Sequence, residues 1–243
     1  MEFLNPIFIV GPTAVGKSAA ALKLAKRLEA EIISLDAMQV YQEVSIASDK
    51  PSREVMQELP HHLVNIISVT EEFNVARYSQ LAQEALVDIQ RRGKTPLFVG
   101  GSGMYMAVLL DGIFDGPIGS SPIREKLLEE LAVHGPAVLY ERLKIQDPQA
   151  ALRIHPHDAQ RIVRALEVGA ATGRSLSSLQ QNRQGWWGKM PVKIIGLNRP
   201  RQELYQRVEM RIDEMFERGL LDEIQGVSKL PLSRSARQII GVP

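Results

Sequence analysis

The segment Gly11-Pro-Thr-Ala-Val-Gly16-Lys17-Ser18 constrains the fold more than any other part of this chain. It fits the pattern G-x-x-x-x-G-K-[ST] and directly follows the apolar run Ile7–Val10. The residues after it, Ala19–Leu28, are nearly all good helix formers. A strand, a glycine-bearing loop and a helix in this order predict a loop whose backbone N–H groups converge on phosphate oxygens.

The residues of this loop have separate predicted tasks. Lys17 supplies a full positive charge, and Ser18 can hold Mg²⁺ through its hydroxyl group. The alternative is a glycine-rich turn that carries a lysine by chance. We expect a phosphorylated ligand to be bound by the whole loop, which consists of Gly11, Pro12, Thr13, Ala14, Val15, Gly16, Lys17 and Ser18.

Strand-like and helix-like segments alternate around this loop. The pattern predicts an α/β fold of the P-loop NTPase type, with a parallel sheet flanked by helices. The expected strands are Ile7–Val10, Glu31–Leu35, Leu63–Ile67, Pro96–Val99 and Val192–Leu197. The expected helices of this core are Ala19–Leu28, Tyr78–Arg92, Met104–Leu110 and Leu204–Arg218.

The character of the sequence changes between Asp115 and Gly185. No strand-like run occurs there, and helical stretches are separated by Gly, Pro and Asn. The expected helices are Pro122–Val133, Pro136–Leu143 and Asp158–Thr172. We therefore expect a discontinuous core of residues 1–114 and 186–243, interrupted by an all-helical insert at 115–185.

Composition excludes several classes of protein. No apolar run approaches the ~18 residues needed to span a bilayer, and the N-terminus lacks the regions of a signal peptide. The chain has no cysteine, so it has neither disulfides nor a thiolate metal site. A net charge of +1 means that any basic surface is local. We expect a cytoplasmic monomer with no membrane contact.

Asp36 is the first candidate for chemistry outside the phosphate loop. It directly follows the apolar run Ile32–Leu35, at the carboxyl end of an expected strand. Ligands of open α/β sheets bind along that edge. Asp36 could act as a general base or hold a metal ion, and a turn or helix-capping aspartate is the alternative.

A second glycine-rich loop, Gly100-Gly101-Ser102-Gly103, follows the expected strand Pro96–Val99 and lies at the same predicted edge. Ser102 could offer its hydroxyl and backbone donors to a phosphate or a substrate. The alternative is a turn that favours glycine for steric reasons alone.

Two groups of arginines could bind phosphate. Arg207 and Arg211 are four residues apart and share one helical face, where they could clamp a diphosphate or pair with nearby acids. Arg161 and Arg164 belong to a stretch from Leu152 to Arg183 with five arginines, no lysine and two acids. They could face RNA, or form a plain solvated helix face. The histidine pairs at 61–62 and 155–157 lack the further ligands of a metal site.

Five segments together resemble the tRNA dimethylallyltransferases, also called tRNA isopentenyltransferases. They are GPTAVGKS (11–18), EIISLDAMQVY (31–41), PHHLVNI (60–66), VGGSGMY (99–105) and HPHDAQRIVRALEV (155–168). The resemblance runs from Ile7 to about Gly241. That family transfers a dimethylallyl group from dimethylallyl diphosphate to the exocyclic amine of the adenosine 3′-adjacent to the anticodon, giving N6-dimethylallyladenosine.

The resemblance also implies roles for individual residues. Asp36 would be the general base, Arg207 would bind the diphosphate with Arg211 as second choice, and Ser102 would replace the threonine that the family usually has. Mg²⁺ would be held at Ser18. The tRNA anticodon stem-loop would be contacted by Asp36, Ala37, Met38, Gln39, Ser102, Arg124, Gln160, Arg161, Ile162, Val163 and Arg164.

The sequence departs from the family pattern at its end. The family continues past the Ala236–Gly241 region with a further basic, aromatic-containing helical stretch, whereas this sequence ends at Pro243. Val242 also stands where the family usually has tyrosine after the glycine. We expect residues 1–243 to fold and bind the donor, with weak tRNA modification.

Three other functions use the same phosphate loop, which is also typical of ATP-binding and other nucleotide-binding proteins. They are a kinase of a small metabolite, an isopentenyltransferase that acts on free AMP, and a non-catalytic nucleotide-dependent switch. The kinase and the AMP enzyme do not need an arginine-biased insert of about 70 residues, and the switch does not need Asp36.

Overall fold

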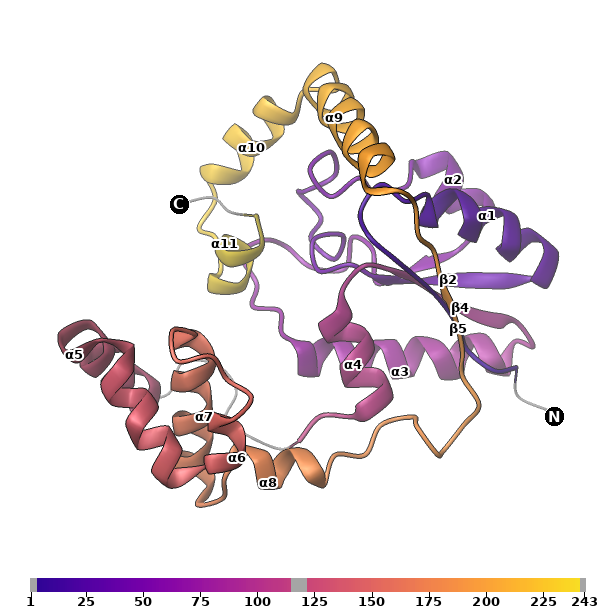
Figure 1. The fold of residues 1–243 in the computed structure, drawn as a ribbon. Coiled ribbons are helices and arrows are strands. Elements are labelled where there is room, and N and C mark those ends of the chain that lie inside the picture. Colours follow the sequence, from indigo (N-terminus) through magenta and orange to yellow (C-terminus); the bar gives the residue numbers. More distant parts are fainter. Residues whose placement is uncertain (1–3, 115–121, 241–243) are drawn as a thin grey trace. The chain divides into compact units, whose positions relative to one another are not determined.

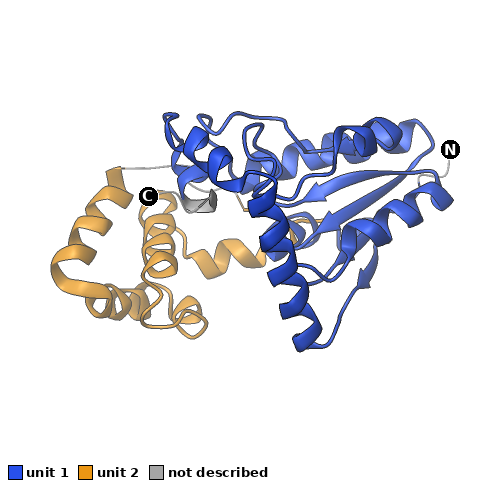
Figure 2. Ribbon diagram, turned by 90° about the horizontal axis from the view of Figure 1, so that it is seen from above, with its two compact units in different colours: residues 1–110, 186–243 blue, residues 111–185 orange. Residues whose placement is uncertain are grey.

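A computed structural model describes residues 4–114 and 122–240. The chain divides into two compact units (Figure 2). Unit 1 consists of residues 1–110 and 186–243, and unit 2 of residues 111–185. The insert therefore begins at Asp111, a few residues before the expected boundary at Asp115.

Unit 1 is built on a five-stranded parallel sheet with the strand order β3-β2-β4-β1-β5 (Figure 1). Because all strands run the same way, their carboxyl ends meet at one edge of the sheet. The strands are β1 (Ile7–Val10), β2 (Ala30–Leu35), β3 (His61–His62), β4 (Thr95–Gly100) and β5 (Lys193–Gly196).

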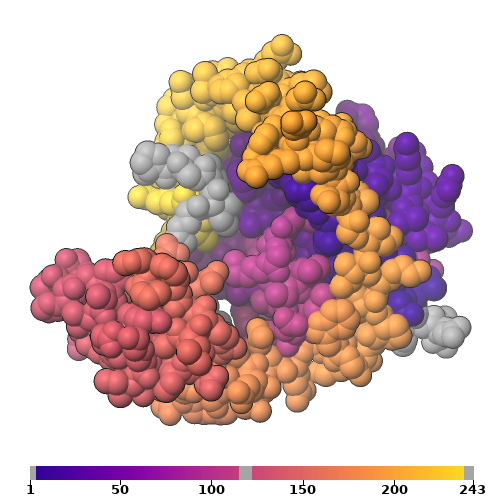
Figure 3. All heavy atoms as spheres, in the orientation of Figure 1, coloured from indigo at the N-terminus to yellow at the C-terminus, as the bar shows by residue number. Residues whose placement is uncertain are grey.

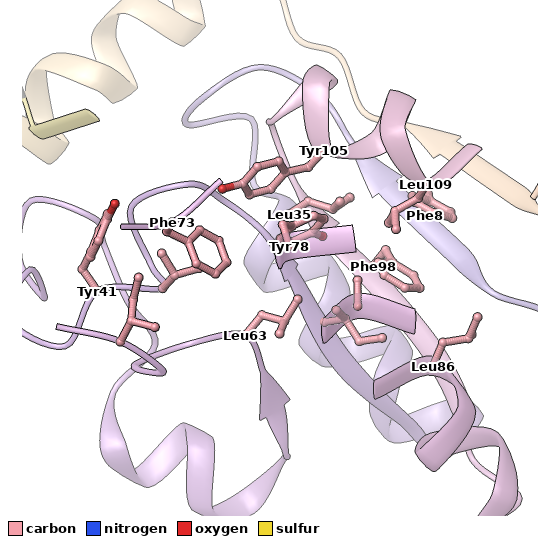
Figure 4. Packing of buried hydrophobic residues seen from close by; sticks show 14 of the residues in the cluster. Phe8, Leu35, Tyr41, Leu63, Phe73, Tyr78, Leu86, Phe98, Tyr105 and Leu109 are labelled. Atoms are coloured by element: carbon pink, nitrogen blue, oxygen red, sulfur yellow. The ribbon is translucent and has the colours of Figure 1, made fainter. Parts of the chain in front are cut away.

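Neighbouring residues of the strands point to opposite faces of the sheet, and both faces are covered. Ile32 and Leu97 belong to a core cluster with Ala21 and Ala25 of α1 (Lys17–Leu28). Ile33 and Phe98 belong to a larger cluster on the other face, where α3 (Val75–Arg91) and α4 (Gly103–Asp111) supply Tyr78, Leu86, Tyr105 and Leu109 (Figure 4). The predicted parallel α/β fold is confirmed.

One expected strand is wrong. Leu63–Ile67 is a loop, and the strand at this place is the two-residue β3 just before it. Leu63 and Asn65 have φ values of 61° and 57°, which an extended strand does not allow. Leu63 and Ile67 are nevertheless buried, so the apolar run marks burial in this case and not a strand.

Of the remaining helices described in unit 1, one lies between β2 and β3 in the sequence and the others follow β5. The expected helix at 204–218 is confirmed as α9, which begins three residues earlier, directly after Pro200. These helices are α2 (Arg53–Glu58), α9 (Arg201–Glu217), α10 (Leu220–Ser228) and α11 (Arg234–Ile240).

Unit 2 is helical throughout the part that the structure describes. Its first helix, α5 (Pro122–Gln146), is interrupted at Gly135, where φ is 76° and Pro136 follows. The two helices expected on either side of this break are therefore both present. The other helices are α6 (Pro148–Ala151), α7 (Ala159–Thr172) and α8 (Leu176–Gln181).

The core of unit 2 lies between α5 and α7. Leu139, Leu143, Ile162 and Val163 have no exposed surface. Asp147 ties α6 and α8 together, because its carboxylate accepts the backbone N–H groups of Ala150 at 3.0 Å and Ser177 at 2.8 Å.

None of the helices in residues 4–114 and 122–240 is long and apolar enough to cross a membrane.

Candidate active site

The phosphate loop joins β1 to α1, as its sequence predicts. Gly11 has a φ of 153°, and a Cβ at this position would lie 2.5 Å from the Leu197 carbonyl oxygen. Gly16 has a φ of 103°, which only glycine adopts readily. Both glycines are therefore required by the backbone, and α1 begins immediately afterwards at Lys17.

Lys17 lies inside the curve of this loop. Its Nζ atom donates to the carbonyl oxygens of Gly11 at 2.9 Å and Pro12 at 2.8 Å. Burial lowers the pKa of Lys17, the carboxylate of Asp36 opposes this change, and the charge of Arg211 adds to it. The ammonium group thus lies in the electrostatic field of residues that come from β2 and α9.

Asp36 lies at the carboxyl end of β2, beside the phosphate loop. Its Oδ1 atom accepts the backbone N–H of Met38 at 2.8 Å, so the aspartate also shapes the turn that follows the strand. Asp36 is half-buried and lines the cavity described below. The turn role that was the alternative is therefore present, and it leaves the carboxylate facing the same space as Lys17.

The segment after Asp36 is fixed by side chains. Gln39 accepts from the Ser34 hydroxyl at 2.8 Å and donates to the carbonyl oxygens of Ser48 and Asp49 at 3.3 and 3.4 Å. Ala37 and Met38 pack against the core of unit 1. Of the expected tRNA contacts in 36–39, Asp36 and Gln39 line the cavity.

The second glycine-rich loop lies against the first. At Gly100 a Cβ would lie 2.4 Å from the Leu35 carbonyl oxygen, and at Gly101 it would lie 3.8 Å from Lys17 Nζ. The backbone N–H of Ser102 donates to the Leu35 carbonyl oxygen at 3.0 Å, and the Ser102 hydroxyl accepts the backbone N–H of Tyr105 at 3.3 Å. Gly100 and Gly101 line the cavity. Ser102 directly precedes α4 and is not among the residues that line it.

The two arginines of α9 reach the phosphate loop and its surroundings. Arg207 Nε donates to the Ala14 carbonyl oxygen at 2.6 Å, and Arg211 Nε lies 3.4 Å from Asp49 Oδ2. Sequence reasoning missed Arg199, whose Nε donates to the Val15 carbonyl oxygen at 2.9 Å. In Figure 3, α9 lies directly above the indigo surface of the N-terminal residues.

These elements line an open cavity of about 500 Å³. Its polar wall contains three cations of the predicted site, which are Lys17, Arg207 and Arg211, together with the carboxylate of Asp36. Its apolar wall includes Leu22, Ile32, Val55, Val99 and Met210. The cavity can therefore hold an anionic group at one part of its wall and an apolar group at another.

Sequence reasoning also missed Lys50, which lines the cavity although its residue surface is only 8% exposed. Its Nζ atom donates to the carbonyl oxygens of Tyr41 and of Gln42, the latter at 3.4 Å. Burial lowers its pKa to about 8, while Glu223 and Glu43 favour the charged form. The sequence around Lys50, including Pro51 after it, contains no pattern that predicts a buried lysine side chain.

In unit 2, helix α7 carries most of the other expected tRNA contacts. Gln160 and Arg161 are exposed, and Arg161 forms an ion pair of 3.3 Å with Asp158. Ile162 and Val163 have no exposed surface, because they form the core of the unit. Their side chains cannot contact tRNA, and the expectation for these two residues is corrected.

The last two expected contacts, Arg124 and Arg164, share one carboxylate. Each donates to Glu167 Oε2, at 3.2 and 2.9 Å, and Glu167 is completely buried. These arginines therefore have a structural task, because an unpaired buried carboxylate is costly. His155 and His157 lie near each other, but no group of metal-binding side chains occurs among the described residues.

Comparison with known proteins was made on both sequence and structure. The IPP transferase family matches residues 39–243. A tRNA dimethylallyltransferase 2 of Geotalea uraniireducens (strain Rf4) is 43% identical over 91% of this chain and 71% of its own length. A tRNA dimethylallyltransferase of Moorella thermoacetica is 45% identical over 89% of this chain and 68% of its own length.

Solved structures agree with the sequence relatives. A tRNA isopentenylpyrophosphate transferase from Bacillus halodurans is 35% identical with a TM-score of 0.63, over 96% of this chain and 73% of its own. A eukaryotic dimethylallyltransferase acting on tRNA is 33% identical with a TM-score of 0.77, over 93% of this chain and 56% of its own.

Proposed function

The chain belongs to the IPP transferase family and transfers a dimethylallyl group to an adenosine of tRNA, and we propose that the cavity of unit 1 is where this transfer occurs. The kinase, AMP-acceptor and switch alternatives are set aside, because relatives of 40% identity and more are tRNA dimethylallyltransferases. The observation that carries the proposal is the convergence of Lys17, Arg207, Arg211 and Asp36 on one cavity.

The donor is dimethylallyl diphosphate, and its leaving group is an anion. As the bond from C1 of the dimethylallyl group to the diphosphate oxygen breaks, negative charge develops on the diphosphate. Lys17 and the arginines of α9 are positioned to stabilise that charge, with the backbone N–H groups of residues 11–18. This explains why a transferase that need not use ATP has a phosphate loop.

The acceptor amine of adenine is a weak nucleophile, because its lone pair is delocalised into the ring. Asp36 accepts the proton that the amine loses as the new N–C bond forms, which is general-base catalysis. Its carboxylate faces the same cavity as Lys17, so the acceptor amine and the donor's C1 meet between them. An adenosine in a single-stranded loop can leave its stack at modest cost to enter the cavity.

The residues present fit a magnesium ion. Ser18 offers a hydroxyl oxygen on the wall of the same cavity, and Mg²⁺ is commonly held by one or two protein oxygens together with waters and substrate phosphates. Bound there, the ion would neutralise charge on the diphosphate. Monomeric state and cytoplasmic location stay predictions.

Asp36→Asn tests the proposal directly. The amide keeps the size of the side chain and can still accept from Met38, but it cannot take a proton. We expect kcat to fall by ~10²–10⁴ with donor affinity nearly unchanged. Steady-state transfer from labelled dimethylallyl diphosphate to tRNA measures kcat, and calorimetry measures the affinity for the donor. A variant with more than half of the wild-type rate excludes Asp36 as the base.

A further inference from the structure

Asp49 lies where α9 meets the loop that follows β2. Its Oδ2 atom is 3.4 Å from Arg211 Nε, and its Oδ1 atom is 3.9 Å from Arg218 Nη1. Arg211 has 29% of its side chain exposed and lines the cavity, as Asp49 does. Asp49 thus connects Arg211 of α9 to the loop that follows β2.

The loop that carries Asp49 is fixed by α10. The carboxylate of Glu223 accepts the backbone N–H groups of Ser45, Ile46 and Ala47 at distances of 2.8 to 3.0 Å. Asp49 then donates its own N–H to the Ile46 carbonyl oxygen at 3.0 Å. Charge-assisted bonds of this kind are among the stronger ones in proteins. The Asp49 carboxylate is therefore presented to α9 by a well-anchored loop.

Arg211 needs such a partner because it shares the cavity with another cation. The charge of Arg211 lowers the pKa of Lys17, so the two positive groups repel each other. A long arginine side chain also loses rotamer entropy when it is held in one position. The attraction between Arg211 and the Asp49 carboxylate opposes both effects.

We propose that Asp49 is a positioning residue that holds Arg211 beside Lys17 to bind the diphosphate of the donor, and that Glu223 fixes the loop that presents Asp49. The proposal rests on the proposed function, because it takes a diphosphate as the ligand of the cavity. It concerns the leaving group of the donor and not the transfer of the proton.

Positioning and simple charge make opposite predictions for Asp49→Asn. Asp49 is an anion near the diphosphate site, so its neutralisation alone would strengthen donor binding. Loss of its hold on Arg211 would weaken binding instead. Asn is a suitable replacement, because Asp49 has a φ of 49° and Asn adopts the left-handed region as readily as Asp.

The experiment is a double-mutant cycle on Asp49→Asn and Arg211→Gln. Calorimetry measures the affinity for inorganic diphosphate with Mg²⁺, and steady-state assays measure KM for dimethylallyl diphosphate and for tRNA. We expect Arg211→Gln to weaken diphosphate binding roughly tenfold, as for loss of one bond to a charged group. Asp49→Asn should weaken it about three- to tenfold, and the double variant no further than Arg211→Gln. In both single variants, KM for dimethylallyl diphosphate should rise while KM for tRNA stays unchanged.

Two matched controls accompany the cycle. Arg218 is the other arginine near Asp49, and Arg218 does not line the cavity. Arg218→Gln should therefore leave diphosphate affinity unchanged. Glu223→Gln should weaken binding in the same direction as Asp49→Asn, whereas Asp222→Asn, its exposed neighbour on α10, should not. These controls separate positioning from a general change in charge.

The possible results distinguish positioning by Asp49, a role of Asp49 independent of Arg211, and an error in the diphosphate site itself. If Asp49→Asn binds diphosphate as tightly as the wild type, or more tightly, while Arg211→Gln binds it weakly, positioning by Asp49 is overturned and the proposed function stands. If additive losses are found, Asp49 does not act through Arg211. If neither Lys17→Ala nor Arg211→Gln changes diphosphate affinity, the diphosphate site itself is wrong.

Discussion

At the scale of single residues, Lys17 is the group on which we expect diphosphate binding to depend most directly. Its ammonium group is held by two carbonyl oxygens of its own loop and faces the cavity. We expect Lys17→Ala to weaken calorimetric binding of diphosphate with Mg²⁺ by roughly 10- to 100-fold, because a bond to a charged group contributes ~1.5–3 kcal/mol. Lys23→Ala, on the exposed side of the same helix, is the matched control. Equal affinities for both variants would contradict the assignment.

Lys50 gives a prediction that depends on pH. Its pKa is lowered by burial from 10.5 to about 8, against the opposing charges of Glu223 and Glu43. Below pH 8 the lysine is charged in both states, and burying that charge lowers the free energy of unfolding. Between pH 8 and 10.5 the folded chain releases the proton while the unfolded chain keeps it. The free energy of unfolding then rises with pH by at most ~1.4 kcal/mol per unit.

Lys50→Met lacks this titration and serves as the reference. Urea unfolding of both proteins at pH 7, 8, 9 and 10 should give a difference in unfolding free energy that moves in favour of the wild type as the pH rises. Groups common to both proteins cancel in this difference. A difference that stays constant from pH 7 to 10 would show that the pKa of Lys50 is not lowered by burial.

At the scale of elements, helix α7 combines an exposed face and a buried face. Arg161 has 73% of its side chain exposed, whereas Arg164 pairs with the buried Glu167. We expect Arg161→Ala to weaken tRNA binding and to reduce the slope of log affinity against log salt by about 0.7–0.9, as for one phosphate contact. Arg164→Ala should instead lower the melting temperature, because Glu167 loses an ion partner.

Arg174→Ala is the control for Arg161→Ala, because it removes an equal charge from an exposed loop position of the same unit. Filter binding of tRNA at several salt concentrations, with melting curves for each variant, separates the two effects. If Arg161→Ala and Arg174→Ala reduce the slope equally, the effect is general charge and not a contact of α7.

The sequence predicted elements best where a local pattern determines them. The phosphate loop follows from Gly11, Gly16 and the strand before it, and α9 follows from a long run of helix formers. The short helices α2, α6, α8, α10 and α11 were not predicted, because their few turns carry little periodicity. The apolar run at 63–67 was assigned to a strand because apolar character reports burial and not backbone geometry.

The site shows the same limit of local patterns. Asp36, Lys17 and Arg207 could be named from the sequence, because each follows a strand or lies on a regular helix. Asp49 and Glu223 could not, since their roles depend on contacts between loops and helices more than 160 residues apart in the sequence. Ile162 and Val163 were expected to contact tRNA because the family resemblance implied a role for the whole stretch 160–164, whereas α7 buries both side chains in the core of unit 2.

At the scale of the whole molecule, each unit has its own hydrophobic core. Leu86 of α3 belongs to the core of unit 1, and Leu139 of α5 belongs to the core of unit 2. Both leucines have no exposed surface. Two cores allow the units to lose stability separately, so a change in one need not abolish the ligand binding of the other.

This gives a matched pair of variants, Leu86→Ala and Leu139→Ala. Each should lower the stability of its own unit by ~2–5 kcal/mol, because a buried cavity replaces the side chain. Leu139→Ala should speed amide hydrogen exchange in α5 and α7 and weaken tRNA binding, while diphosphate with Mg²⁺ binds as in the wild type. Leu86→Ala should speed exchange in α3 and the sheet and weaken diphosphate binding. If either variant speeds exchange equally in both units, the chain unfolds as one cooperative body, and the division of donor and tRNA binding between two units loses its physical basis.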